Sequence, residues 1–172
     1  MQKMGVSYGI PIFFMFVKKN MRALIQRVSE ASVIINKKVK AKIPEGMLIF
    51  LGIENDDTIE DITYLTYKIT RMRIFADKDG KMNRSIHEII PARIMVISQF
   101  TLFADSRKGN RPSFVRAARP EFARMMYEMF ILQLEKETNN PIASGEFGAD
   151  MKIHLVNDGP ITIWLDSKLR DY

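Results

Sequence analysis

Seven short apolar runs, separated by turn residues, dominate the sequence from Met21 onward and constrain its fold more than any other feature. Each run is five to eight residues long and either alternates or is rich in β-branched residues, a pattern typical of strands. The runs are residues 23–28, 31–35, 39–43, 47–53, 93–100, 151–156 and 161–165. We therefore expect a sheet at the centre of the fold.

Two longer stretches place their apolar residues at the spacing of an α-helix. The first follows Thr58 and Asp61, whose spacing resembles a capping box, and the second begins at Pro120, a residue favoured in the first helical turn. The predicted buried faces are Ile59, Ile62, Leu65, Ile69 and Met72 in the first helix and Phe122, Met125, Met126, Met129 and Phe130 in the second. The pattern predicts an α/β (α+β) fold: a single domain with two long amphipathic helices.

The composition limits the chemistry of the chain. Of its 172 residues, 47% are hydrophobic and 27% are charged, the balance of one folded domain with a substantial core. The chain has no cysteine, which excludes a disulfide framework, a cysteine nucleophile and a thiolate metal site, and which fits a reducing compartment. Its two histidines, His87 and His154, are too few for a three-histidine metal site. We expect no metal and no cofactor.

Residues 1–20 differ from the rest and are interpreted as an N-terminal extension of a domain at residues 21–172. Their apolar run, 10–17, contains Pro11 and is far shorter than the roughly 20 residues that span a bilayer. We interpret this extension as the product of a misplaced start codon or as a dispensable tail; the alternative is a short hydrophobic anchor that packs on the domain. We expect a cytoplasmic protein that does not enter a membrane.

Three polar side chains interrupt the apolar run that ends near residue 100. Ser98, Gln99 and Thr101 stand among apolar residues, where a buried strand would normally carry only hydrophobic groups. One interpretation is a strand end whose hydroxyl and amide groups satisfy nearby backbone groups. The other is the polar floor of a pocket for a small polar substrate. No nucleophile elbow, phosphate loop or H-E-x-x-H motif accompanies these residues.

A basic loop follows at residues 105–119, where five residues are basic and one is acidic. Gly109 and Pro112 indicate a loop, and its arginines could bind phosphates with bidentate geometry. Phe114 could stack on a base or anchor the loop. A charged loop that is merely solvated is the alternative.

Asn157, Asp158, Gly159 and Pro160 lie between two of the predicted strands. As a tight hairpin turn this segment needs no function. A Gly-Pro pair can also hold a cis peptide bond, and the sequence by itself leaves both possibilities open.

Six segments occur in the order found in one known family. They are residues 21–28, 80–83, 98–102, 107–114, 145–151 and 157–160. The sequence from Met21 to about Ser167 thereby resembles D-aminoacyl-tRNA deacylases, formerly called D-tyrosyl-tRNA deacylases. The resemblance implies a homodimer with a mostly antiparallel, β-barrel-like sheet. It also implies an editing hydrolase that cleaves the ester between a D-amino acid and the 3′ end of tRNA.

The resemblance implies roles for individual residues as well. Those that match the family's catalytic pocket strand are Ser98, Gln99, Phe100 and Thr101. Phe147 and Met151 match residues near the terminal adenosine. The expected contacts to tRNA phosphates are Arg107, Lys108 and Arg111.

Gly159 and Pro160 match a cis Gly-Pro element that, in the family, enters the pocket of the partner subunit, and Arg27 matches the arginine that braces it. Two carbonyl groups of this element are expected to capture the substrate ammonium group and to occupy the space that an L side chain requires. Glycine has no such side chain, so hydrolysis of glycyl-tRNA, including glycine mischarged on alanine tRNA, is expected too.

An aminoacyl ester is already activated, which makes the missing catalytic triad intelligible. The resemblance implies assistance from the 2′-hydroxyl of the tRNA, while backbone N–H groups near Phe100 and Thr101 could stabilise the oxyanion. The main alternative is a noncatalytic RNA-binding module that uses the basic loop and Phe147. An ordinary esterase is a third possibility, but it would lack a base.

Overall fold

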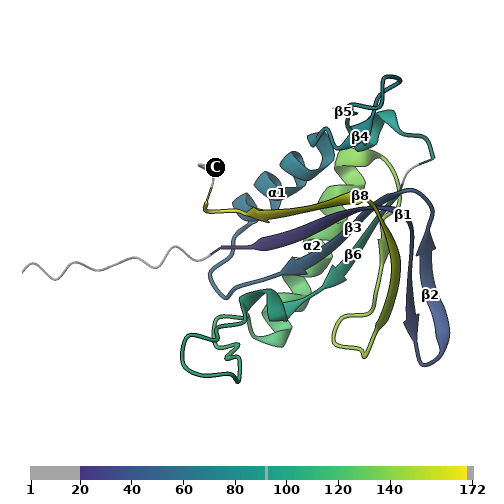
Figure 1. The fold of residues 1–172 in the computed structure, drawn as a ribbon. Coiled ribbons are helices and arrows are strands. Elements are labelled where there is room, and N and C mark those ends of the chain that lie inside the picture. The colour runs from purple at the N-terminus through teal and green to yellow at the C-terminus, as the bar shows by residue number, and fades with distance from the viewer. Residues whose placement is uncertain (1–19, 92, 170–172) are drawn as a thin grey trace, which may run out of the picture.

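The computed structural model describes residues 20–91 and 93–169, so the predicted extension, apart from Asn20, lies outside the described residues. A strongly bent, nearly closed sheet forms the centre, and two helices, α1 (Ile59–Arg71) and α2 (Pro120–Thr138), cover one of its faces (Figure 1). The predicted mixed α/β class, with a barrel-like sheet and two helices, is confirmed. No helix in the described ranges is long and apolar enough to cross a membrane.

Strand β1 (Arg22–Ile35) organises the sheet. Strand β8 (Lys152–Asp166) runs antiparallel along one edge of β1 over nearly its whole length. The other edge of β1 pairs first with β3 (Gly46–Gly52) and then with β2 (Lys38–Ile43). The register between β1 and β8 shifts on both sides of Val28, and the sheet bends there.

Two pairs of predicted strands are in fact continuous. The sequence predicted separate strands at 23–28 and 31–35, but both lie in β1; likewise 151–156 and 161–165 join in β8, except for Met151. The hairpin-turn interpretation of Asn157–Pro160 is therefore wrong, because the chain does not reverse there. A bulge bends each strand without ending it, and a bulge interrupts the apolar pattern much as a turn does.

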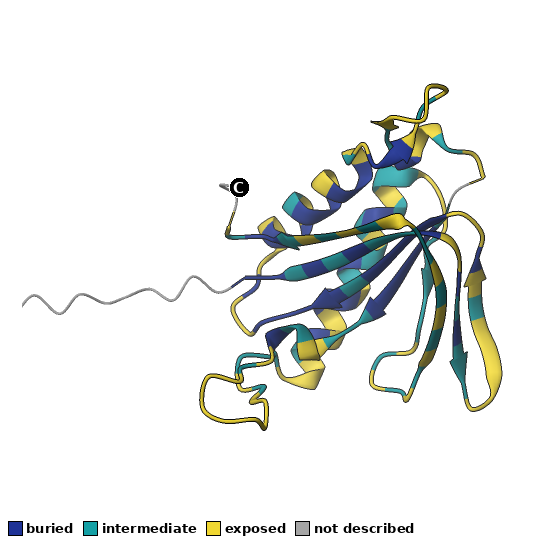
Figure 2. Cartoon of the chain, viewed as in Figure 1, coloured by how far each residue is buried: buried dark blue, intermediate teal, exposed yellow. Residues whose placement is uncertain are grey.

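The remaining strands extend the sheet from β3. Strand β6 (Arg93–Ser98) lies parallel to β3, and the short β7 (Ala143–Ser144) lies parallel to β6. Alternate residues of β3 and β6 face the helices, and the others face the inside of the bend, so both faces of these strands are buried (Figure 2). This double burial explains their continuous apolar runs. A separate hairpin, β4 (Phe75–Ala76) and β5 (Met82–Arg84), follows α1.

The helices pack with faces somewhat different from those predicted. The capping box at α1 is confirmed, since the Thr58 N–H donates to Asp61 Oδ2 at 2.9 Å. Ile59 and Met125, however, are 62% and 47% exposed and do not belong to the core. The buried face of α2 is Ala123, Met126, Tyr127, Phe130 and Leu134. Helical spacing alone does not bury Met125, whereas Tyr127 is buried and its hydroxyl donates to the Val96 carbonyl at 2.7 Å.

A buried polar network joins the two ends of the domain to the segment before α2. Glu54, only 3% exposed, accepts hydrogen bonds from the Asn20 backbone N–H and from Arg116 Nε, both at 2.8 Å. Arg116 also donates to Asn20 Oδ1 at 2.9 Å, and the Asn20 amide donates to Asp166. Arg116 was counted in the predicted basic loop, but its charge is used here to compensate a buried carboxylate.

We expect Arg116→Met to lower the free energy of unfolding by about 3 kcal/mol, because it leaves Glu54 buried without its cation. Chemical denaturation measures this loss. Arg107→Met is the matched control: Arg107 pairs with Asp105 on an exposed loop, where an ion pair contributes less than about 1 kcal/mol. Equal losses in the two variants would contradict a structural role specific to Arg116.

A second buried carboxylate, Asp57, lies beside this network and is 5% exposed. Its Oδ2 accepts the Glu54 N–H at 2.8 Å, while Oδ1 has no hydrogen-bond partner within the described residues. Burial raises the pKa of Asp57 from 3.8 to about 7. The nearby carboxylates of Asp61 and Glu54 also raise this pKa, whereas the hydrogen bond from the Glu54 backbone N–H lowers it. The Lys168 ammonium opposes this shift, but it is paired with Asp61 at 2.6 Å.

Since the native state holds this proton more tightly than the unfolded chain, Asp57 stabilises the fold below its usual pKa of 3.8 and loses that contribution as the pH rises to about 7. We expect the free energy of unfolding to fall over this interval and Asp57→Asn to flatten the slope. Denaturation at several pH values measures it. Glu60→Gln, an exposed change three residues later in the first turn of α1, should keep the slope; an unchanged slope in Asp57→Asn would refute the assignment.

Candidate functional site

A cavity of about 600 Å³ lies where β3 and β6 end, beside the first turn of α2. Its walls come from the ends of these strands and from two later segments, 114–123 and 147–153. Aromatic and aliphatic side chains predominate, and Asp150 is the one ionisable side chain among the described residues that line it. Such a largely apolar hollow with a few polar groups is the usual form of a small-molecule site.

The polar floor of the cavity is Ser98 and Gln99, which follow directly on the buried part of β6. Ser98 lies opposite Leu51 in the parallel pairing, and the Gln99 N–H donates to the Leu51 carbonyl at 2.7 Å. The chain then turns into a short 3-10 helix, Phe100–Phe103. The pairing with β3 thus holds Ser98 and Gln99 in place. The chain leaves the sheet after Gln99, and Phe100 then lines the cavity.

Thr101 is placed differently from the other residues of this segment. Its side chain is exposed and does not line the cavity, but its hydroxyl accepts a hydrogen bond from the Gln99 amide. The backbone N–H groups of Phe100 and Thr101 begin the 3-10 helix, so they have no partner within it. Thr101 therefore contacts the cavity-lining segment through the Gln99 amide and through its own backbone.

Phe100 joins the strand end to the basic loop. Its ring meets that of Phe114 edge-to-face, with centroids 5.1 Å apart and an interplanar angle of 77°. Both rings line the cavity. Such a pair stabilises by about 0.5–1.5 kcal/mol beyond its area burial, so Phe114 anchors the loop to the cavity wall.

Phe147 and Met151 form another part of the cavity wall. Met151 reaches the site because Gly145 has no side chain: a Cβ there would lie 2.4 Å from the Met151 sulfur. The Phe147 ring lies 5.9 Å from that of Tyr127, and the Arg124 guanidinium lies 5.4 Å from its centroid. Burial raises the pKa of Tyr127, which remains a neutral donor to the backbone.

Gly159 and Pro160 lie elsewhere, exposed at the bulge in β8 and outside the walls of the cavity. The peptide bond between them is cis, and Gly159 has a φ of +120°. A Cβ at Gly159 would lie 2.8 Å from Ile161 Cγ1 and 3.3 Å from the Arg27 guanidinium. Only glycine fits this backbone without displacing a neighbour.

Arg27 braces the bulge from the adjacent strand. Its Nε lies 2.8 Å from Asp158 Oδ2, and it donates to the Ile74 carbonyl at 2.7 Å. Asn157 completes the brace by donating to the carbonyls of Arg27 and Ile161, at 3.0 and 2.9 Å. Side chains on both strands therefore fix the shape of this exposed segment.

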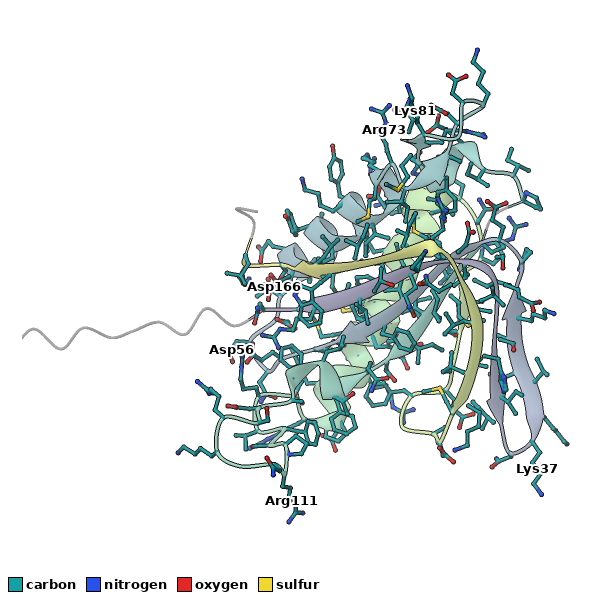
Figure 3. The ribbon with its side chains drawn as sticks, viewed as in Figure 1. Lys37, Asp56, Arg73, Lys81, Arg111 and Asp166 are labelled. Atoms are coloured by element: carbon teal, nitrogen blue, oxygen red, sulfur yellow. The ribbon has the colours of Figure 1, made fainter. Side chains whose placement is uncertain are left out.

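The basic loop projects from the domain below the cavity. Hydrogen bonds of 2.8 Å in both directions between the Asp105 and Ser113 backbones close it. Arg107 folds back on Asp105, with contacts of 2.5–3.1 Å that hold the pKa of that carboxyl well below its usual range. Lys108 and Arg111 pair with no carboxylate of the described chain, and Arg111 points outward from the loop (Figure 3).

Sequence reasoning missed part of the cavity wall. Leu51 and Ile53 were recognisable in principle, because parallel strands that end together bring their last residues to one edge. Ala117, Ala118 and Ala123 carry no chemical signature and enter the wall only through tertiary packing. No three potential metal ligands gather anywhere in residues 20–91 and 93–169.

Comparisons with known proteins match most of the chain. Residues 24–166 match the family model described as D-Tyr-tRNA(Tyr) deacylase. Proteins named D-aminoacyl-tRNA deacylase from Flavobacterium johnsoniae and Akkermansia muciniphila are 53% and 52% identical over 151 residues, which cover 88% of this chain and all of each relative.

Two solved structures share the fold. One, titled c-Myc DNA Unwinding Element Binding Protein, is 37% identical with a TM-score of 0.78 and covers 84% of this chain and 97% of its own. The other, a probable eukaryotic D-amino acid tRNA deacylase, is 16% identical with a TM-score of 0.75 and covers 86% and 99%. The family match and the identity to the curated relatives together show that this chain belongs to the D-Tyr-tRNA(Tyr) deacylase family.

Proposed function

We propose that this protein is an editing hydrolase that cleaves D-aminoacyl-tRNA to a free D-amino acid and tRNA. The observation that carries the proposal is the cavity itself: the Ser98, Gln99 and Phe100 segment forms its floor in a chain about half identical to curated deacylases along their entire length. Water adds to the ester carbonyl, and the bond to the tRNA 3′ oxygen then breaks.

The chemistry of the cavity suits an activated ester. The described residues that line it include no histidine, lysine or cysteine, and their one ionisable side chain is the weakly basic carboxylate of Asp150, so the walls offer no strong base or nucleophile. The 2′-hydroxyl of the terminal ribose assists the attacking water, and the backbone N–H groups of Phe100 and Thr101 stabilise the oxyanion. Each such donor contributes about 10²–10³ in rate. No metal or cofactor takes part in this scheme.

Chiral selection requires a second subunit. Gly159 and Pro160 are braced and exposed but lie outside the cavity of their own chain. The outer edge of β8, which carries them, has no partner strand in the described part of the chain, and Val156 and Trp164 on it are 52% and 39% exposed. An unpaired edge with exposed apolar side chains favours association. In the proposed homodimer, each Gly-Pro element enters the partner's cavity.

The energy needed for this selection is modest. A thousandfold preference for D over L corresponds to about 4 kcal/mol, which a steric clash in a close-packed pocket supplies. The carbonyls of Gly159 and Pro160 capture the substrate ammonium and occupy the space of an L side chain. Backbone groups do not read side-chain identity, so many D-amino acids and also glycine are accepted.

The basic loop supplies contacts to the tRNA backbone. Lys108 and Arg111 offer free charges there, while Arg107 is partly neutralised by Asp105. Contacts of this kind are sequence-independent and weaken with salt. Phe147 and Met151, which line the same cavity as Gln99, hold the terminal adenosine. The protein acts on tRNA, and a cytoplasmic location fits this substrate.

A noncatalytic nucleic-acid-binding module is the alternative. The name of the 37% identical structure, a DNA unwinding element binding protein, favours this class for that relative. It accounts for the basic loop but gives no reason for the braced Gly-Pro bulge or for the polar floor of the cavity.

Deacylation of matched D-tyrosyl-, L-tyrosyl- and glycyl-tRNA separates these possibilities. We expect rapid release of D-tyrosine and measurable release of glycine. The rate on L-tyrosyl-tRNA should be at least about a thousandfold lower, because the Gly-Pro carbonyls exclude its side chain. Equal rates on D and L would indicate an ordinary esterase. Binding without hydrolysis of any of the three would indicate the noncatalytic module.

Mixed dimers test the shared site. Gly159→Ala and Gln99→Ala should each lose activity, the first because its Cβ forces the bulge to shift. In a heterodimer of the two variants, one site combines an intact cavity with an intact partner bulge, so up to half of the normal activity per dimer should return. The two homodimers alone are the controls. A heterodimer as inactive as its parents would place the whole site within one chain.

A further inference from the structure

Arg124 lies next to the cavity wall and forms no ion pair with any carboxylate of the described residues. It lies in the first turns of α2, directly after Ala123, which lines the cavity, and its side chain is exposed. Helical side chains lean toward the N-terminus of their helix, and Pro120 and Ala123 at that end of α2 line the cavity. Its guanidinium lies over the ring of Phe147, another residue of the cavity wall.

The lack of a partner is notable because two carboxylates are within easy reach in sequence. Glu121 and Glu128 lie three residues before and four residues after Arg124, the spacings at which ion pairs form on a helix. Neither forms an ion pair with Arg124, nor does any other described carboxylate. The arginines that pair with carboxylates elsewhere in the described chain are Arg22, Arg27, Arg71, Arg107 and Arg116.

A guanidinium that rests on an aromatic ring keeps the donors along its edge free. The Arg124 guanidinium carbon lies 5.4 Å from the centroid of the Phe147 ring, within the range of a cation–π contact, and the paired N–H donors of a guanidinium match the two oxygens of a phosphate. Arg124 therefore has donors available for an anion beside whatever occupies the wall at Phe147.

From this arrangement we propose that Arg124 binds the phosphodiester on the 5′ side of the terminal nucleoside of the substrate. This proposal rests on the proposed function, which places the terminal adenosine against Phe147 and Met151. Arg124 is a positioning residue: it fixes the last nucleotide so that the ester carbonyl lies over Gln99 and Phe100. The contact is separate from those of Lys108 and Arg111, which meet the tRNA backbone farther from the ester.

Three esters of D-tyrosine test the proposal: the full D-tyrosyl-tRNA, the 3′-ester of adenosine 5′-monophosphate, and the 3′-ester of adenosine. Arg124→Met keeps an apolar stem on Phe147 but removes the charge. We expect kcat/KM to fall about tenfold for the tRNA and for the nucleotide ester, with no change for the nucleoside ester. Arg124→Lys should recover part of the loss.

Two further variants are matched controls. Glu128→Gln, one turn along the same helix, should leave all three rates unchanged. The double variant Lys108→Ala with Arg111→Ala should slow the tRNA alone, because the nucleotide ester is too short to reach the loop. If the wild type hydrolyses only the tRNA, inhibition of that reaction by adenosine 5′-monophosphate is compared with inhibition by adenosine. The wild type should be inhibited more strongly by the nucleotide than by the nucleoside, and Arg124→Met should abolish this difference.

The possible failures are distinguishable. A wild-type protein that hydrolyses none of the three esters refutes the proposed function. An active wild type whose Arg124→Met variant slows the nucleoside ester as much as the nucleotide ester shows that Arg124 merely supports Phe147. An unchanged preference for the nucleotide overturns the phosphate contact directly.

Discussion

Strand β1 is paired along both of its edges, with β8 on one side and with β3 and then β2 on the other. β1 pairs with three neighbouring strands, and the sheet bends at the point along β1 where its pairing with β3 ends and its pairing with β2 begins. The register shifts between β1 and β8 on both sides of Val28 mark that point. The same bend brings Arg27 beside Asp158. It also encloses a hydrophobic cluster on the side of the sheet away from the helices, formed by Val28, Ala31, Val33, Ile43, Leu48, Met95 and Ile97. The braced Gly-Pro bulge is thus a consequence of how β1 is shared.

The cavity follows from the way two parallel strands end together. β3 and β6 are buried on both faces, so nearly all of their side chains are apolar up to the edge of the sheet. Ser98, the last residue of β6, and Gln99, which follows it, bring polar groups to the cavity, and the Phe100–Phe114 contact joins this strand end to the basic loop. A rigid sheet therefore positions a small polar surface inside an otherwise apolar wall.

Local pattern predicted the elements well and their connections less well. The strand runs, the capping box at Thr58 and the helix start at Pro120 were recognisable because each depends on neighbours in sequence. Whether 157–160 is a turn or a bulge depends on which strand lies alongside, which no local pattern contains. The resemblance to a family located the candidate pocket residues.

The roles of charged residues, like the connections between strands, depend on tertiary contacts that local sequence does not contain. Arg116 looked like one more cation of a basic loop, but its role is decided by Glu54, which lies 62 residues earlier. From sequence alone, Arg124 reads as a solvated residue, because it lies on a helix between two glutamates. In both cases the meaning of the charge came from a tertiary neighbour that the sequence does not reveal.

The composition of the cavity wall also bears on how the protein could be inhibited. Reagents that inactivate serine or cysteine hydrolases capture a side chain made nucleophilic by a neighbouring base. The described residues that line the wall with Ser98 include no histidine or lysine, Asp150 is their one ionisable side chain, and the chain has no cysteine. Electrophilic warheads therefore meet no thiol and no imidazole-activated serine in this wall, and an inhibitor that matches the shape of the cavity with a stable mimic of the aminoacyl nucleoside suits it better.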